Sequence, residues 1–378
     1  MAGDVSVREE ERRGLFLKRK EQADPEKYGY TPREWARINA KDAAEHRKNV
    51  RLGLIAAALV LVAVLLLYAV YFLIIRSHDY DLSVPFSKDD PVLGIPDTLT
   101  AESTVKSFAS DLCVADSDVG TDRVAMDALS GGLFDLTSHE VIYGKDMFTT
   151  RSPASLTKVM TALVALKYGR LDDMVTVTET AKNVEFGSSV CDIKTGDVLS
   201  LKQLLYGMII ASGNDAALMV AEHVGGSVER FVEMMNEEAL SIGATRTHFV
   251  NPHGLTADDH YTCIYDMYLI FQKAMSYDTF LDMINRKNFY AEYRNVEDGA
   301  VAVTWETTNH YFLGTSTPPD QVVISGGKTG TTEDAGGCLC LLAKDLYGNP
   351  YIAVVMHSAD RDTVYSDMNR ILGAIPSA

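Results

Sequence analysis

The sequence has few features of a metal-binding or disulfide-rich protein. It contains only five cysteines and nine histidines in 378 residues, and neither a C-x-x-C nor an H-E-x-x-H spacing occurs. Because these spacings are the usual signs of zinc and redox sites, we expect no metal and no cofactor. The chain has no internal repeat, and its 47% hydrophobic content excludes overall disorder.

Cysteine pairing is also limited. The five residues are Cys113, Cys191, Cys263, Cys338 and Cys340. An odd number cannot pair completely within one chain. Cys338 and Cys340 lie two apart on an expected strand and point to the same face, which would strain a direct bond. We therefore expect buried free thiols.

Charge is distributed unevenly along the chain. The formal net charge is −17, yet residues 1–51 carry 13 Lys and Arg against 10 Asp and Glu, and the remainder carries 22 against 42. The basic excess is therefore confined to the N-terminus. We expect no nucleic-acid partner.

One long apolar run interrupts this charged sequence. Residues 52–75 read LGLIAAALVLVAVLLLYAVYFLII, which is long enough to span a bilayer with some tilt. A signal peptide is the alternative, but 51 residues precede the run and no small-residue cleavage site follows it. Basic residues precede the run and aspartates soon follow it, so the positive-inside rule places the N-terminus in the cytoplasm. The large C-terminal part is then expected on the outside.

Two polar segments flank this predicted span. Residues 1–51 contain no catalytic motif and predict a solvated juxtamembrane helix; a docking site for a cytoplasmic partner is the alternative. Residues 76–118 contain three prolines among many aspartates, which is typical of an extended, self-repelling linker. This linker would hold residues 119–378 away from the membrane.

The most informative stretch is the start of an expected helix. Ser152 can cap this helix, Pro153 suits its first position, and Gly169 can end it. Ser155 then lies in the first turn, and Lys158 follows on the same face. The rest of the helix is apolar nearly all round, which predicts burial. A lysine that loses hydration has a lowered pKa and can activate a serine nucleophile as a base.

Two later sequence motifs indicate a function for the pair of Ser155 and Lys158. A serine three residues before a lysine is common at helix starts and usually means a cap and a solvated charge. Here Ser212-Gly213-Asn214 and Lys328-Thr329-Gly330 follow in order. The three motifs together resemble the serine DD-peptidases, that is, the penicillin-binding proteins and their serine β-lactamase relatives.

The resemblance is closest to the low-molecular-mass D-alanyl-D-alanine carboxypeptidases and runs from about residue 124 to the end. Its longest matches are the stretch from Gly187 to Ala217 and the string Asn251-Pro252-His253-Gly254-Leu255. It implies that the chain works through an acyl-enzyme. It also implies a protein of the bacterial cell membrane. The chain would act outside the cytoplasm on peptidoglycan pentapeptides.

The resemblance also implies roles for individual residues. Ser155 would attack the carbonyl of the terminal D-Ala-D-Ala bond, and Lys158 would take its proton. Ser212 would relay a proton to the leaving nitrogen, and Asn214 would hold the substrate's backbone amide. The loop around His253 would shape the cleft rather than perform chemistry.

The third motif would bind the end of the substrate. Lys328 and Thr329 would hold its free carboxylate, and Gly330 would let the backbone come close. The backbone N–H groups of Ser155 and Thr331 would form the oxyanion hole. Each of these strings could instead be an ordinary helix break or strand end, but three such coincidences in order are improbable.

The expected fold is an α/β domain. Strand patterns occur near its start, as a hairpin from about Val124 to Tyr143, and again in three runs near its end. Those runs are residues 322–325, 338–342 and 351–356. Helical patterns dominate between them, with a break at Ser212-Gly213-Asn214, and a last helix covers about 363–372. We expect the antiparallel sheet of the β-lactamase and DD-peptidase type, flanked by helices, with a mainly helical subdomain and one preceding transmembrane helix.

β-Lactam antibiotics are expected to inhibit this enzyme rather than be destroyed by it. Serine β-lactamases of this motif type carry a water-activating glutamate in an E-x-x-L-N string about three dozen residues after the second motif. At that distance from Asn214 the chain reads FVNPHG, residues 249–254, without a glutamate.

Two functional hypotheses follow. The first is a membrane-anchored serine DD-carboxypeptidase, with DD-endopeptidase activity on cross-links as a variant. The second is a catalytically weak penicillin-binding sensor or scaffold that signals through residues 1–51. The intact motifs favour the enzyme. The sequence does not distinguish pentapeptide from cross-linked substrate.

Overall fold

The computed structural model describes residues 111–295 and 299–376, together with positions 31, 33, 36–37, 40–41 and 47–50. The chain divides into two units, Met1–Thr98 and Leu99–Ala378. In the first unit the described residues are exposed, and all except Thr31 are helical. This agrees with the helix predicted before the apolar run.

The predicted membrane span, residues 52–75, lies outside the described residues, as does the linker up to residue 110. Within the part of the chain that the structure describes, no helix has both the length and the apolar character needed to cross a bilayer.

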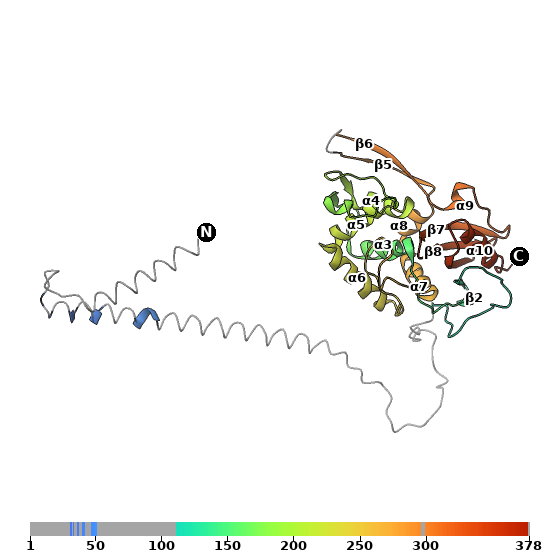
Figure 1. Cartoon of the computed structure of the whole chain (residues 1–378), viewed down its shortest axis with the longest axis horizontal. Helices are drawn as coiled ribbons and strands as arrows, with labels where there is room; N and C mark the ends of the chain where they lie inside the picture. The colour runs from blue at the N-terminus through green and yellow to red at the C-terminus, as the bar shows by residue number, and fades with distance from the viewer. Residues whose placement is uncertain are drawn as a thin grey trace, which may run out of the picture. The chain divides into compact units, whose positions relative to one another are not determined.

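The second unit is built on a five-stranded antiparallel sheet in the order β2-β1-β9-β8-β7. Its strands are β1 (Ser130–Asp135), β2 (Glu140–Lys145), β7 (Val322–Thr332), β8 (Gly336–Asp345) and β9 (Pro350–Ser358). The two ends of the unit therefore share one sheet, since β1 pairs with β9. This confirms the expected α/β class with a sheet closed by the C-terminal strands (Figure 1).

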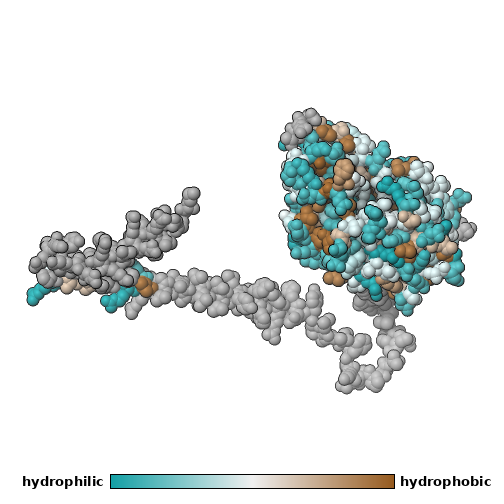
Figure 2. Space-filling view, in the orientation of Figure 1, coloured by the Kyte–Doolittle hydropathy of each residue, from teal (hydrophilic) through white to brown (hydrophobic). Residues whose placement is uncertain are grey.

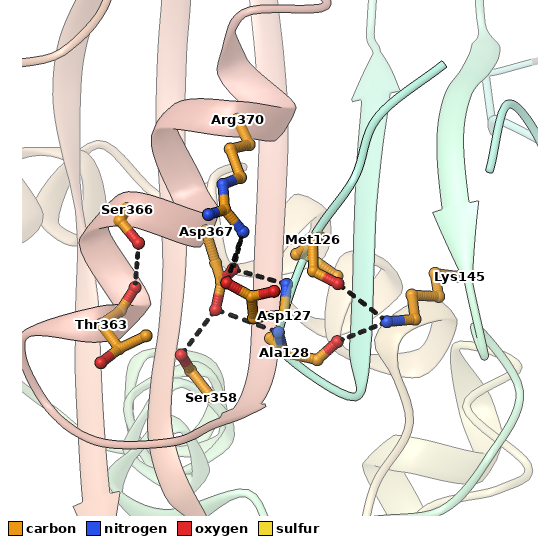
Figure 3. Close-up of polar contacts among 9 residues, drawn as sticks. All are labelled: Met126, Asp127, Ala128, Lys145, Ser358, Thr363, Ser366, Asp367 and Arg370. Carbon is orange, nitrogen blue, oxygen red and sulfur yellow. Dashed lines mark hydrogen bonds and ion pairs between the residues drawn. The ribbon is translucent and has the colours of Figure 1, made fainter. Parts of the chain in front are cut away.

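The first strand begins later than the sequence pattern predicted. The hairpin was expected from about Val124, but β1 starts at Ser130. The backbone of residues 126–128, just before β1, forms hydrogen bonds with side chains rather than with a neighbouring strand. The Asp367 carboxylate accepts from the N–H groups of Asp127 and Ala128, and Lys145 Nζ donates to the Met126 and Ala128 carbonyls (Figure 3).

The sheet separates two apolar cores. Along β8, Leu339 and Leu341 pack with α10 (Thr363–Leu372), while Cys338 and Cys340 belong to the larger core on the other face. This alternation follows from the two-residue period of a strand. All five cysteines are buried and unpaired, as predicted.

Helices form the larger core. They are α3 (Thr157–Tyr168), α4 (Leu201–Ile210), α5 (Asn214–Gly225), α6 (Val228–Ser241), α7 (Ile264–Ala274) and α8 (Asp278–Ile284). The predicted break at Ser212-Gly213-Asn214 separates α4 from α5, and Ser227 caps α6 by accepting from the Arg230 N–H. The predicted last helix has the same bounds as α10.

Smaller elements complete the unit. They are β3 (Met174–Thr176), η3 (Glu179–Lys182), β4 (Val198–Ser200), the hairpin β5 (Asn288–Tyr293) and β6 (Val301–Glu306), and α9 (His310–Leu313). In the space-filling view the visible face of this unit is largely hydrophilic, and apolar residues appear in small groups (Figure 2).

Candidate active site

The start of α3 differs from the prediction in a way that positions Ser155. Ser152 does not cap the helix; a short turn, η2 (Ala154–Leu156), comes first and α3 begins at Thr157. Ala154 has a φ of +46°, a left-handed conformation that L-residues rarely adopt. A helix cannot pass through this residue, so Pro153 is not its first position. Ser155 consequently lies in a strained turn, as many functional residues do.

Two glycines from distant parts of the chain hold this turn in place. A Cβ on Gly254, whose φ is +87°, would lie 1.9 Å from the Ala154 carbonyl oxygen. A Cβ on Gly330 would lie 2.9 Å from the Ser155 nitrogen. Only glycine allows such approaches. Gly330 therefore allows β7 to approach the turn that carries Ser155, and its predicted role beside the substrate stays a prediction.

Ser155 and Lys158 form a direct pair. Lys158 Nζ lies 2.8 Å from Ser155 Oγ, 2.6 Å from Asn214 Oδ1 and 2.7 Å from the His253 carbonyl oxygen. Lys158 has no solvent exposure. Burial lowers its pKa well below the ordinary lysine value, and the nearby charge of Lys328 lowers it further. Such an amine can be neutral and act as a base near neutral pH.

Ser212 and Lys328 form a second pair. Lys328 Nζ donates to Ser212 Oγ at 3.0 Å and to the Thr329 carbonyl at 2.9 Å, and both side chains are buried. Burial, with the charge of Arg361 second, lowers the pKa of Lys328 to about 7. Ser212 has a φ of +60°, so it too occupies a left-handed turn. A lysine that titrates near 7 can both give and accept a proton through this serine.

A cleft of about 1160 Å³ opens above these pairs. Of the predicted site residues, Ser155, Asn214 and Thr331 line it. The other residues on its wall come from the loop 185–189, the turn 254–256, the segment 332–334 and Arg361. Thr329 is not among the described residues that line the cleft. Its hydroxyl is hydrogen-bonded to the hydroxyl of Thr308.

The loop on one wall is bonded to the second motif. The Asn214 N–H donates to the Ser189 carbonyl at 2.9 Å. The buried Asp215 carboxylate accepts from the N–H groups of Cys191 at 2.8 Å and Ile193 at 3.2 Å. Burial raises the pKa of Asp215, and these donors oppose that rise. The loop and the catalytic motif are therefore positioned together.

Three residues with a clear place in the site were not singled out from the sequence. Asp215 directly follows the second motif, which is a signal that could have been used. Arg361, in the turn after β9, is the only cationic side chain among the described residues on the cleft wall. Nothing local marks Arg361, because its proximity to Lys328 depends on the order of the strands. Phe186, on the loop, is the third.

Among the described residues, no group of three or more His, Cys, Asp or Glu side chains is arranged to hold a metal ion. The site consists instead of a serine with a buried amine, a second serine with a titratable lysine, and a cleft whose wall carries the guanidinium of Arg361. This set of groups can form and hydrolyse an ester on Ser155.

Comparison with known proteins identifies the origin of this arrangement. The model of the peptidase S11 family, described as D-alanyl-D-alanine carboxypeptidase, matches residues 118–360. The chain belongs to this family. The match confirms the resemblance inferred from the three motifs and includes the residues of both serine–lysine pairs.

Family relatives resemble the chain over the same region. D-alanyl-D-alanine carboxypeptidase DacF of Bacillus subtilis is 31% identical over 252 residues, which are 65% of this chain and 62% of DacF. DacC of Escherichia coli is 33% identical over 258 residues, 66% of this chain and 61% of DacC. The chain thus spans about three fifths of the length of these relatives.

Solved structures of the family share the fold. The crystal structure of a Streptomyces DD-transpeptidase superposes with a TM-score of 0.61 at 28% identity, covering 66% of this chain and 97% of that chain. The DacD structure from Francisella tularensis superposes with a TM-score of 0.57 at 25% identity, covering 69% and 73%.

Proposed function

We propose that this chain is a membrane-anchored serine DD-carboxypeptidase that removes the terminal D-alanine from peptidoglycan stem peptides. The observation that carries the proposal is the environment of Lys158. Two carbonyl oxygens, Asn214 Oδ1 and that of His253, can accept the two N–H groups of a neutral amine. The remaining lone pair then faces Ser155 Oγ and can take its proton.

Acylation follows from the two pairs. Ser155 Oγ bonds to the carbonyl carbon of the penultimate D-alanine, and its proton moves to Lys158. The Ser155 and Thr331 N–H groups would stabilise the oxyanion. Ser212 gives its proton to the leaving nitrogen and takes one from Lys328. The C–N bond breaks, and D-alanine departs.

Deacylation restores both pairs. Water attacks the ester carbonyl and passes a proton through Ser212 to Lys328. The ester bond breaks, and Lys158 returns its proton to Ser155 Oγ. The products are a shortened peptide with a new carboxylate and an enzyme in its starting protonation state.

The free carboxylate of the substrate would bind beside the positively charged side chain on the cleft wall. Arg361 lines the cleft, whereas Lys328 is 1% exposed and bonded to Ser212. We propose that Arg361 and the exposed Thr331 contact the carboxylate, and that Lys328 attracts this carboxylate through its charge without touching it. Replacing Arg361 by leucine should therefore raise the KM for peptides more than it lowers kcat.

Inhibition by β-lactams is part of the proposal. The segment 249–254, where a β-lactamase would carry its glutamate, instead supplies the His253 carbonyl to Lys158 Nζ and places Gly254 against Ala154. Intact-protein mass spectrometry after penicillin treatment should show an adduct on Ser155 that persists for minutes. An adduct that disappears within seconds, with many equivalents of penicillin hydrolysed, would indicate a β-lactamase.

Two assays test the central proposal. Fluorescent penicillin should label the purified chain, and D-alanine should be released from a pentapeptide. Labelling without D-alanine release would favour the sensor or scaffold hypothesis. Release from cross-linked muropeptides alone would favour an endopeptidase.

A DD-transpeptidase is the second candidate, because the Streptomyces DD-transpeptidase is matched over 97% of its own length. A transpeptidase passes the acyl group to an amine. Adding an amine acceptor such as glycylglycine should leave most of the product hydrolysed if the chain is a carboxypeptidase.

We further propose that residues 52–75 anchor the enzyme in a bacterial cell membrane, with residues 1–51 in the cytoplasm. The sequence supports this through its uncharged run and the basic residues before it. Protease added to intact spheroplasts should then digest residues 119–378 and spare an N-terminal tag. Crosslinking from residues 1–51 would test for a cytoplasmic partner.

A further inference from the structure

The cleft is larger than the end of its proposed substrate requires. Its volume of about 1160 Å³ exceeds the roughly 300–1,000 Å³ of pockets that enclose whole small-molecule ligands. A terminal D-Ala-D-Ala fills only a small part of that space. The cleft therefore has room for the residue that precedes D-Ala-D-Ala as well.

Apolar surface is scarce in this cleft. Among the described residues on its wall, only Phe186 and Leu255 have large apolar side chains; the others are serine, threonine, asparagine, glycine, arginine and acidic residues. Leu255 is half-buried, whereas the Phe186 ring is fully exposed. An exposed aromatic ring on the wall of a binding cleft gains free energy when a ligand covers it.

The position of Phe186 is set by local geometry. Ser188 donates to the Glu185 carbonyl through its N–H at 3.1 Å and through its hydroxyl at 2.7 Å. Phe186 and Gly187 are therefore the two central residues of a tight turn. Gly187 has a φ of +83°, as the second central position of a type II turn requires.

This turn is tied to the catalytic motif. The carbonyl of Ser189, three residues after Phe186, accepts from the Asn214 N–H. Three residues of chain span at most about 11 Å. Phe186 thus lies on the same cleft wall as Asn214, the residue predicted to hold the substrate's backbone amide.

We propose that Phe186 determines substrate specificity, because its ring packs against the side chain of the residue that precedes D-Ala-D-Ala. This inference rests on the proposed carboxypeptidase function. The preceding residue is the neighbour of the acylated D-alanine, about 3.8 Å away between Cα atoms. The glycan is separated from Ser155 by the rest of the stem peptide.

The test uses the purified full chain and three N-acetylated tripeptides that end in D-Ala-D-Ala. Their first residue is glycine, norleucine or lysine. The wild type should release D-alanine faster from the norleucine and lysine peptides than from the glycine peptide. Phe186→Ala should lower kcat/KM about tenfold for the two long side chains, mainly through KM, and less than twofold for glycine.

Matched variants separate this contact from general effects. Phe186→Leu should retain most of the preference, because it keeps apolar surface at the same place. Tyr347→Ala removes another exposed aromatic, in the turn between β8 and β9, and should change none of the three values.

The outcomes distinguish this inference from the function on which it rests. A wild type that releases no D-alanine from any peptide would overturn both. An active wild type in which Phe186→Ala changes all three peptides equally, or none, would overturn the inference alone. A loss confined to the lysine peptide would also overturn it, since norleucine offers the same apolar chain.

Discussion

Lys158 and Asp367 are both ionisable side chains with no solvent exposure, but their partners differ. Lys158, under the cleft, bonds to three neutral oxygens. Among the described residues no carboxylate hydrogen-bonds to it, and Lys328 is the charge that affects its pKa most. Its ammonium form is therefore disfavoured.

Asp367, on α10, has the opposite surroundings. Its carboxylate accepts from the N–H groups of Asp127 and Ala128, and from Ser358 Oγ at 2.6 Å. Arg370 NH1 lies 3.4 Å away and pairs with Asp127 as well (Figure 3). Each acceptor position faces a donor, as a buried charge requires.

The difference shows how one fold uses buried charge in two ways. At Asp367 donors surround the carboxylate, and their hydrogen bonds join α10 to the segment before β1. At Lys158 burial and the charge of Lys328 lower the pKa, so the neutral amine that a base requires is favoured. The first arrangement contributes to stability and the second to reactivity.

The largest expected effect comes from removing a residue of the reactive pair, Ser155 or Lys158. Ser155→Ala should abolish covalent labelling by fluorescent penicillin, because no nucleophile remains. Lys158→Ala should slow acylation by about 10² to 10⁴, the usual range for a general base. Circular dichroism should show both variants folded. Near-normal labelling of either would contradict the assignment.

Replacing the buried carboxylate, in Asp367→Ala, should lower the stability of the protein. This change leaves two N–H groups and Ser358 without their acceptor, and should lower the free energy of unfolding by about 3–5 kcal/mol. Urea denaturation measures the loss. The control is Asp127→Ala, which removes only the exposed partner of Arg370 and should cost below about 1 kcal/mol. Folded Asp367→Ala should acylate at the wild-type rate; a large loss would link the two regions.

Acid should lower the free energy of unfolding, because buried histidines near the cleft resist protonation in the folded state. Burial lowers the pKa of His260 to about 4, below the ordinary value near 6.5. The unfolded state then binds a proton that the folded state does not, so stability is complete above pH 6.5 and falls as pH drops toward 4. His260 alone should account for about 2 kcal/mol between pH 6.5 and 5.

His260→Gln tests this contribution. Its loss of unfolding free energy between pH 7 and 5 should be smaller than that of the wild type. An unchanged pH dependence would show that His260 does not carry it. His253, whose pKa burial lowers to about 3, would remain in the variant and contribute in the same direction.

The smallest expected effect concerns the coupling of the two lysines. The charge of Lys328 lowers the pKa of Lys158, so Lys328→Gln should raise it. Penicillin acylation, which needs neutral Lys158, should then lose rate at a higher pH than in the wild type. Stopped-flow acylation from pH 5 to 9 measures this acid limb. A limb at the same pH or lower would mean that the lysines are not coupled.

Much of the architecture was predictable because its signals are local. The break between α4 and α5, the Ser227 cap, the last three strands and α10 follow from short patterns of turn residues and apolar periodicity. The odd number of cysteines required at least one free thiol, and the structure leaves all five unpaired. The hairpin β5–β6 and α7 were not singled out, although they have similar patterns.

The sequence by itself determined the family and which groups are proposed to carry the chemistry: the order of three motifs pointed to Ser155, Lys158, Ser212 and Lys328. The conformation that brings these residues together was decided by tertiary structure. Ala154 adopts its left-handed turn where Gly254 and Gly330, about 100 and 176 residues later, approach it. Arg361 reaches the cleft because β9 lies beside β8 in the sheet. Local patterns cannot encode such contacts, since the energy that maintains them comes from burial that exists only once distant segments have packed together.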